Sequence, residues 1–319
     1  MFSCDHPFVL LDDARPVGAA PARLYRNPVE TIVARTAKEV RDVLPSLRNS
    51  RYHLAGFVSY DAGHALEPRL EPLAQATTLP LLWFGLFDGF EEIPAAEVAA
   101  VLPDPRGGWA GRPVPQIDRA GYAAAFAQVA DYIASGDVYQ VNLSFRANVA
   151  IAGHPLAVYA GLRQRAQAGY GGLVWTGEDW LLSMSPELFF ALHDGKITTK
   201  PMKGTAARAS TPAADELVVR QLAQDPKQRA ENLMIVDLLR NDLSRVAVSG
   251  SVAVPQLFSV ETYPTIHTMT STVTGRLENG RSAVDVITAI FPCGSITGAP
   301  KIRAMEIIDE VEQGSRGLY

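Results

Sequence analysis

Lys203 stands in the setting of this sequence best suited to chemistry. It lies between Pro201 and Gly204, in a run that ends with Thr205. Glycine lets a backbone approach a ligand closely, and a partly buried amine loses proton affinity and becomes a nucleophile. The run therefore predicts a reactive lysine; the alternative is an exposed lysine at the end of a strand.

Two glutamates stand in unusual surroundings. Glu187 follows a Ser-Pro pair and precedes three apolar residues. A carboxylate there is costly unless it is paired or functional, which indicates either a general acid or base or an ion pair with a nearby Arg or Lys. Glu231 shares a helical face with Ile235 and Leu238, so it could hold a hard cation through oxygen. The alternative is a solvated glutamate that the helix dipole favours.

A glycine-rich loop begins at Gly294 and carries two hydroxyl groups, Ser295 and Thr297, before Pro300. The free N–H groups and positive dipole end at a helix start bind anions. The spacing of the loop differs from that of a Walker phosphate loop, so we interpret it as suited to a carboxylate. An ordinary capped helix start is the alternative.

The alternating run of residues 139–146 places Gln140, Asn142 and Ser144 on one face. This polar face either lines a cavity or faces water. His267 is a single histidine, which is more often structural than catalytic. We find no Ser–His–Asp arrangement and no His-rich metal spacing.

These residues need elements to position them, and local patterns predict several. Helices are expected over residues 122–133, with Gly136 at the C-cap, over residues 225–239 and from Pro300 onward. Extended segments are expected over residues 139–146, 180–192 with a break at 185–187, and 196–203. Residues 93–115 predict a loop or linker. Strands and helices mix without a βαβ rhythm, which favours an α+β fold with mostly antiparallel sheets.

The bulk composition is that of a globular protein. The 319 residues are 47% hydrophobic and carry a formal net charge of -5, which argues against a nucleic-acid partner. The two cysteines, Cys4 and Cys293, lie far apart, so we expect no disulfide scaffold and a reducing, cytoplasmic setting. No signal peptide or membrane-spanning run is apparent.

Taken together, these segments resemble the chorismate-utilising enzymes, a family that includes the anthranilate, aminodeoxychorismate, isochorismate and salicylate synthases. The resemblance is clearest over residues 122–319 and rests mainly on the blocks 229–242 and 294–309. Residues 8–15 and 56–61 also match.

Two positions indicate the branch. Water-adding members of the family have a lysine where this chain has Gln140, and glutamine cannot act as that base. Residues 201–205 read Pro-Met-Lys-Gly-Thr, which resembles the aminodeoxychorismate-forming branch, whereas the anthranilate branch reads Pro-Ile-Ala-Gly-Thr. The resemblance thus implies that chorismate is aminated to 4-amino-4-deoxychorismate, towards para-aminobenzoate and folate. The alternatives are an anthranilate synthase component I and a non-catalytic chain that only binds a glutaminase.

The resemblance also implies a role for each matching position. Lys203 would be the covalent nucleophile and Glu187 the general acid or base. Glu231 would bind Mg²⁺, which would grip the ring carboxylate of chorismate. Contacts with chorismate would come from Gly204, Thr205, Gln140, Gly294, Ser295 and Thr297.

The fold that the resemblance implies has two large, roughly orthogonal antiparallel sheets flanked by helices. Residues 1–115 would form an N-terminal region and residues 116–319 the chorismate-binding domain. A glutaminase would supply ammonia, a fused lyase domain could follow, and no nucleic acid or membrane would be bound. Because the sequence stops inside a family motif at Tyr319, we expect a fold that is incomplete at its C-terminus.

Overall fold

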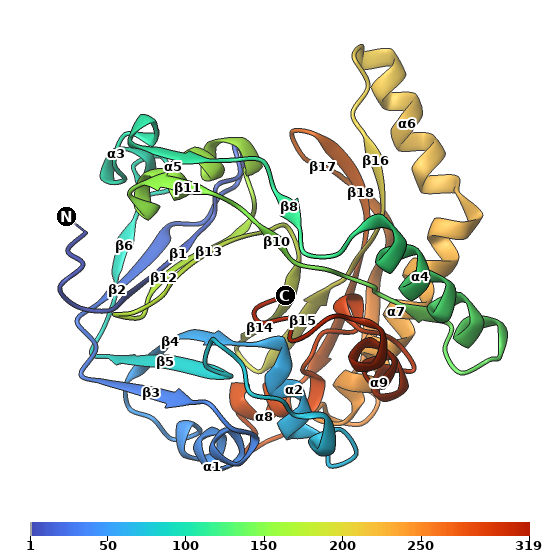
Figure 1. Cartoon of the computed structure of the whole chain (residues 1–319), viewed down its shortest axis with the longest axis horizontal. Coiled ribbons are helices and arrows are strands. Elements are labelled where there is room, and N and C mark those ends of the chain that lie inside the picture. The colour runs from blue at the N-terminus through green and yellow to red at the C-terminus, as the bar shows by residue number, and fades with distance from the viewer. Residues whose placement is uncertain (1) are drawn as a thin grey trace.

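The computed structural model describes residues 2–319 and combines helices with antiparallel sheets (Figure 1). Among these described residues, two sheets have five strands each, one has three, and three further pairs have two strands each. Every strand pairing between described elements is antiparallel. The expected α+β class is confirmed.

The first five-stranded sheet combines strands from residues 8–93 with two strands from residues 170–185. Its strand order is β13-β12-β1-β2-β6, with the bounds β1 Phe8–Asp12, β2 Ala22–Arg26, β6 Glu91–Ile93, β12 Tyr170–Trp175 and β13 Trp180–Ser185. Leu10 packs with Leu24 and Tyr159 on one face, and Val9 packs with Trp83 on the other, because neighbouring strand residues point to opposite faces. Helix α5 (Pro155–Ala166) covers the first face and supplies Tyr159.

The second five-stranded sheet carries most of the candidate site. Its order is β14-β15-β18-β16, with β17 also paired to β18, and its bounds are β14 Leu188–His193, β15 Lys196–Lys200, β16 Met202–Ala207, β17 Ala253–Thr262 and β18 Ile266–Arg276. Helices α6 (Pro212–Gln224), α7 (Pro226–Ser244) and α8 (Ala283–Ile290) follow its strands in the chain. Ile235, Leu239 and Leu243 recur every four residues on α7 and pack against Ile197 and Val273 of the sheet.

The three-stranded sheet has the order β3-β5-β4, with the bounds β3 Glu30–Ala34, β4 His53–Val58 and β5 Leu82–Phe87. Helix α1 (Ala37–Leu47) begins with a capping box formed by Thr36 and Glu39. It buries Val40 and Leu44 against this sheet. The chain then runs through the short helices η1 (Tyr60–Ala62), α2 (Gly63–Leu66) and η2 (Glu71–Leu73).

The two-stranded pairs join loops far apart in sequence. β7 (Gly108–Ala110) pairs with β11 (Ile151–Gly153), β8 (Val114–Pro115) with β10 (Ala147–Asn148), and β9 (Gln140–Val141) with β19 (Gly298–Ala299). Helix α9 (Lys301–Val311) precedes the last residues, which lie between the two five-stranded sheets in Figure 1. No described helix is long and apolar enough to cross a membrane.

Most of the expected elements are confirmed. Helix α4 spans Arg119–Ala134, and Gly136 just beyond it has φ of +81°. Helix α7 begins after Asp225, whose side chain accepts a hydrogen bond of 2.9 Å from the N–H of Gln228. The strand break at residues 185–187 separates β13 from β14, and α9 starts directly after Pro300.

Two expectations are wrong. The strand over residues 139–146 is reduced to Gln140–Val141, because the next backbone donors find other partners: Ser144 N–H donates to the Glu312 carboxylate at 2.7 Å. Residues 93–115 are more than a loop. They contain the short helices α3 (Val98–Val101) and η3 (Pro105–Gly107) and the strands β7 and β8. Strand β7 pairs with β11 and strand β8 with β10, both of which lie beyond residue 145.

The boundary expected between residues 115 and 116 runs through paired strands. β1 lies beside β12, with Leu10 opposite Leu173. The first sheet therefore draws its strands from both sides of that boundary, and the two-domain division stays a prediction.

Candidate active site

Lys203, which the sequence predicts to be reactive, is positioned by an irregularity in β16. Met202 lies opposite Thr270 and Thr205 opposite Thr268, so Lys203 and Gly204 face one residue of β18 where a regular ladder would need two. Gly204 has φ of +84°, a conformation that glycine adopts without strain. This β-bulge turns the Lys203 side chain out of the ladder, and Lys203 Nζ donates to the carbonyl oxygen of Ser295 at 2.9 Å.

Gly204 is held from two sides. Its carbonyl accepts a hydrogen bond of 3.0 Å from the hydroxyl of Thr268, and a Cβ atom there would lie 2.9 Å from Oε1 of Gln228. Thr205, expected to contact substrate, is exposed on the next position of β16.

Glu187 occupies the turn between β13 and β14. The backbone N–H of Glu187 donates a hydrogen bond of 3.2 Å to the hydroxyl of Ser185, and this bond shapes the turn. Glu187 Oε1 accepts another of 3.1 Å from the N–H of Met202, next to the lysine. Burial raises the pKa of Glu187, and the opposing effects of Ser295, Met202 and Lys203 are smaller.

The pKa of Lys203 shifts in the opposite direction to that of Glu187. Burial lowers the pKa of Lys203, and the charges of Glu187, Cys293 and Glu231 oppose that shift without reversing it. Both shifts favour the uncharged forms, a neutral amine beside a protonated carboxyl group. The Lys203 amine thus lies where its own strand β16 meets three segments far apart in sequence, which carry Glu187, Glu231 and the loop at 293–295.

The loop expected to bind an anion forms the opposite wall. Helix η4 (Gly294–Ile296) packs so closely on α7 that a Cβ on Gly294 would lie 2.5 Å from Cδ2 of Leu238. Thr297 is buried, and its hydroxyl donates to the carbonyl of Cys293 at 3.1 Å. The loop thus exposes the Ser295 carbonyl to Lys203 in a fixed position.

Gln140 joins the site through the β9–β19 pair, where it lies opposite Ala299. Within residues 2–319, Gln140 Oε1 and Ser295 Oγ are both buried and have no hydrogen-bond partner. Buried polar atoms are almost always paired, so two orphan atoms on neighbouring segments indicate that a polar ligand completes the site.

Glu231 lies one turn after Gln228 on α7, and its carboxylate is 3.8 Å from the exposed Lys227 ammonium. Its side chain is 35% exposed, and its charge reaches Lys203. The described residues contain no group of three His, Cys, Asp or Glu side chains arranged to hold a metal. Glu231 alone therefore offers a single carboxylate, which suits a cation that takes its other ligands from substrate and water.

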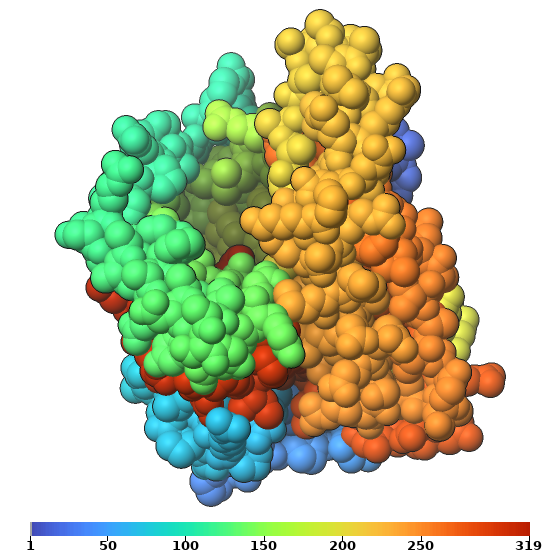
Figure 2. All heavy atoms as spheres, turned by 90° about the vertical axis from the view of Figure 1, so that its right-hand side faces the viewer, coloured from blue at the N-terminus to red at the C-terminus, as the bar shows by residue number. Residues whose placement is uncertain are grey.

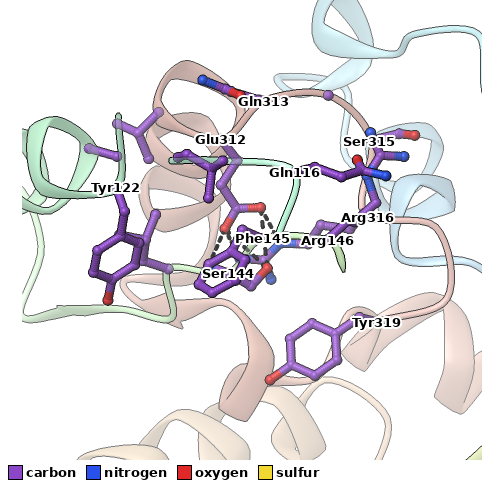
Figure 3. A pocket seen from close by; sticks show the side chains of 15 residues that line it. Gln116, Tyr122, Ser144, Phe145, Arg146, Glu312, Gln313, Ser315, Arg316 and Tyr319 are labelled. Atoms are coloured by element: carbon purple, nitrogen blue, oxygen red, sulfur yellow. Dashed lines mark hydrogen bonds and ion pairs between the residues drawn. The ribbon is translucent and has the colours of Figure 1, made fainter. Parts of the chain in front are cut away.

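A cavity of about 220 Å³ lies on the side of α4 and the C-terminal residues. Figure 3 shows Ser144, Glu312, Arg316 and Tyr319 around it, with the Glu312 carboxylate bound to both Ser144 and Arg316. The polar face expected at residues 140–144 lines a cavity at Ser144. In Figure 2 the surface is also hollowed between the green segments around β7 and β8 and the yellow α6.

The histidine singled out from the sequence has a structural place. His267 is buried in β18, where Nδ1 lies 2.9 Å from the Thr262 hydroxyl and Nε2 lies 2.8 Å from the Asp215 carboxylate. Asp215 also binds Arg208, so this network ties α6 to the sheet.

The sequence profile of the family described as chorismate binding enzyme matches residues 6–319. The chain belongs to this family. Aminodeoxychorismate synthase component 1 of Klebsiella aerogenes is 47% identical over 203 residues, which are 64% of this chain and 45% of that protein. Anthranilate synthase component 1 of Thermus thermophilus is 38% identical over 218 residues, 68% of this chain and 47% of that protein.

The fold also matches solved structures. The crystal structure of anthranilate synthase component I from Streptococcus pneumoniae TIGR4 has a TM-score of 0.77 and 25% sequence identity, and the match covers 96% of this chain and 80% of that one. In the two sequence matches above, by contrast, the aligned stretches span about half the length of the curated relatives.

Three residues that sequence reasoning missed lie beside the site residues or support them. The Cys293 thiol lies beside Glu187 and Lys203, and burial raises its pKa to about 11. Asn232 is buried next to Glu231, with its Nδ2 unpaired among the described residues. Arg316 donates to the carbonyl of Ile296 and so braces the η4 loop. Only Asn232 had a signal, as a polar residue at a helical position otherwise expected to be apolar.

Proposed function

We propose that this chain aminates chorismate to 4-amino-4-deoxychorismate, with Lys203 as a covalent nucleophile. The observation that supports it most is the pairing of a buried lysine, whose pKa is lowered, with a buried glutamate, whose pKa is raised. The identity of 47% to an aminodeoxychorismate synthase component 1 supports the same reaction.

In the first step, the neutral amine of Lys203 attacks ring carbon 2 of chorismate. Both ring double bonds shift, from carbons 1–2 and 5–6 to carbons 1–6 and 4–5, and the bond from carbon 4 to its hydroxyl breaks, while the protonated carboxyl group of Glu187 supplies the proton that lets water leave. The pKa directions suit this step, since it needs an uncharged nucleophile and a protonated acid together.

In the second step, ammonia attacks carbon 4, both double bonds shift back and the bond from carbon 2 to the Lys203 amine breaks. The Glu187 carboxylate, now ionised, accepts a proton from the incoming nitrogen. Gln140 supports ammonia over water as the nucleophile, because its amide offers no base to activate water and its Oε1 is buried and unpaired in the described chain.

Chorismate would lie against the η4 loop, with Ser295 Oγ and Gln140 Oε1 as the polar atoms it satisfies. Gly204, Thr205, Gly294 and Thr297 would border it. We propose that Glu231 shares a Mg²⁺ ion with the ring carboxylate, an arrangement typical of Mg²⁺ sites that use one or two carboxylates plus substrate oxygens. When bound, the ion would neutralise substrate charge that the acidic residues nearby would otherwise repel.

The name "component 1" carried by the relatives supports a second subunit. We propose that a glutaminase delivers ammonia to this site. A fused lyase domain, allowed by the resemblance, stays a prediction.

The test compares Lys203→Ala with Lys196→Ala, which removes an exposed lysine of β15. With chorismate, Mg²⁺ and ammonium chloride, we expect Lys203→Ala to lose at least 1,000-fold in amination rate, as removal of an activated nucleophile generally does. Product is measured by liquid chromatography and mass spectrometry, and Lys196→Ala should keep the rate of the unaltered chain. An undiminished rate in Lys203→Ala would refute the lysine role.

The second candidate is an anthranilate synthase component, favoured by the match to the Thermus thermophilus and Streptococcus pneumoniae proteins. The same assay separates them, because anthranilate is fluorescent and is released with pyruvate. The remaining alternative is a chain that only binds a glutaminase. Isothermal titration of chorismate with Mg²⁺ decides that point, since heat of binding contradicts a purely scaffolding role.

A further inference from the structure

A second, smaller cavity lies between the η1–α2 segment and the C-terminal end of α9. Its volume is about 20 Å³, enough for one molecule the size of water. Tyr60 and His64 line it from one side, Asp309 and Glu312 from the other. Gln75, an exposed residue, lies on its rim.

Two buried polar atoms of this cavity have no hydrogen-bond partner among the described residues. Tyr60 is 3% exposed and His64 is 5% exposed, and among residues 2–319 neither the Tyr60 hydroxyl nor His64 Nδ1 has a hydrogen-bond partner. Both residues line the cavity. Leaving two such groups unpaired is costly, so their presence points to a bound species that pairs with both.

The charges of the lining side chains indicate that the bound molecule is a cation. Three carboxylates line it, those of Asp61, Asp309 and Glu312, against the single guanidinium of Arg316. Glu312 is engaged by that guanidinium, and Asp61 accepts the backbone N–H groups of Arg316 and Gly317. Asp309 has no hydrogen bond or ion pair with another described residue, and burial raises its pKa.

We propose that this cavity binds one ammonium ion, with the Tyr60 hydroxyl, His64 and the Asp309 carboxylate as its hydrogen-bond acceptors. Ammonium is the size of water, carries the positive charge that the carboxylates favour and donates up to four hydrogen bonds. Burial lowers the pKa of His64, so its ring stays neutral and keeps a nitrogen free to accept. A divalent metal suits the cavity poorly, because it would need more oxygen ligands than the lining provides.

The cavity adjoins the candidate active site through one side chain. The Arg316 guanidinium donates to the carbonyls of Ile296 and Asn142, and the carbonyl of Ser295 next to Ile296 holds Lys203 Nζ. An ammonium ion here would be a single side chain away from the η4 loop. In that respect the inference rests on the proposed function, since ammonia is the proposed second substrate.

The first test locates the ion directly. Thallium(I), a heavy monovalent cation of similar size, is soaked into crystals of the whole chain without chorismate, and anomalous scattering is recorded. We expect a peak between Tyr60 and Asp309. A cavity with no anomalous peak holds only water and overturns the proposal.

The second test uses stability in solution. At equal ionic strength, ammonium chloride should raise the thermal midpoint above that in sodium chloride by about 3 °C, as expected for a ligand at ten times its Kd. Tyr60→Phe and Asp309→Asn should abolish this difference. The control Asp237→Asn, which alters an exposed aspartate on α7, should keep it.

These readouts involve no turnover, so they are separable from the amination assay. If the ammonium effect is present but no amination occurs, the function is wrong and the cation site stands. If amination occurs while midpoints in the two salts agree in every variant, the cation site is wrong and the function stands.

Discussion

At the scale of single residues, the proposed chemistry depends on two groups whose pKa values move towards each other. Burial lowers the pKa of Lys203 and raises that of Glu187. Proton transfer between them therefore needs less free energy than between a free lysine and a free glutamate.

The pH dependence of the reaction follows from this pair. In the proposed mechanism the reactive form has a neutral Lys203 and a protonated Glu187, so its population rises and then falls with pH. We expect a bell-shaped profile of kcat/KM with ammonium chloride, corrected for the fraction of free ammonia. In Glu187→Gln one limb of the bell should disappear and the maximal rate should fall by about 100-fold or more. A profile with both limbs intact in that variant would contradict the assignment.

Gly204→Ala tests the bulge. At φ of +84° an alanine is strained, and its Cβ would meet Gln228. We expect the free energy of unfolding to fall by about 1 kcal/mol, with a larger relative loss of kcat because Lys203 is displaced. Urea unfolding and steady-state kinetics check this, with Gly195→Ala in the exposed β14–β15 turn, where φ is +72° and a Cβ meets nothing within 4 Å, as the backbone control.

Residue types were more predictable than residue neighbours. Lys203, Glu187, Glu231 and Ser295 each had a local reason to be noticed, and the fold gathers them from distant segments. Tyr60, His64 and Arg316 gave no such signal. Their significance depends on burial and on the close approach of η1, α2 and α9, which no short stretch of sequence encodes.

At the scale of elements, position depends on caps, bulges and side-chain networks. Helices α4 and α7 were predictable because their caps and apolar periodicity are local. The segment 139–146 was not, because an alternating pattern resembles a strand, while its actual partners are a two-residue strand and the carboxylate of Glu312. Tyr139 is 76% exposed and Phe145 is 50% exposed, so only Val141 and Leu143 of the apolar half of that pattern pack against a core cluster.

The network at His267 leads to a stability prediction. Hydrogen bonds from Arg208 and then His267 hold the pKa of Asp215 well below its usual 3.8. A depressed carboxylate pKa stabilises the folded state above the unfolded pKa, and that contribution is lost as the pH falls through the folded value. Asp215→Asn should therefore unfold at lower urea concentration at pH 7, and the gap to the unaltered chain should narrow below pH 4. A gap independent of pH would contradict the charge-based account.

At the scale of the whole molecule, strands from distant parts of the chain pair with one another, and the division into residues 1–115 and 116–319 stays a prediction. The composition of residues 93–115 predicted a linker, yet β7 and β8 inside it pair with β11 and β10. Pairing between distant segments is invisible to local composition, which is why the class of the fold was predictable and its connectivity was not.

A fragment of residues 1–115 tests this organisation. It lacks β12, β13 and α5, so Leu10 and Leu24 would lose Leu173 and Tyr159 from their core. We expect the fragment to show no cooperative thermal transition and to bind a hydrophobic dye, whereas the whole chain unfolds cooperatively. A sharp transition in the fragment, seen by circular dichroism, would establish an independent N-terminal domain.

Because β1 pairs with β12, it cannot complete its sheet contacts during biosynthesis until β12 has been translated. Phe8 leaves the ribosome early, but its partner Trp175 emerges on the order of ten seconds later. During that interval the apolar edge of β1 is open to other nascent chains. Cells making this protein therefore have reason to shield its first strand with a chaperone until translation has passed β12.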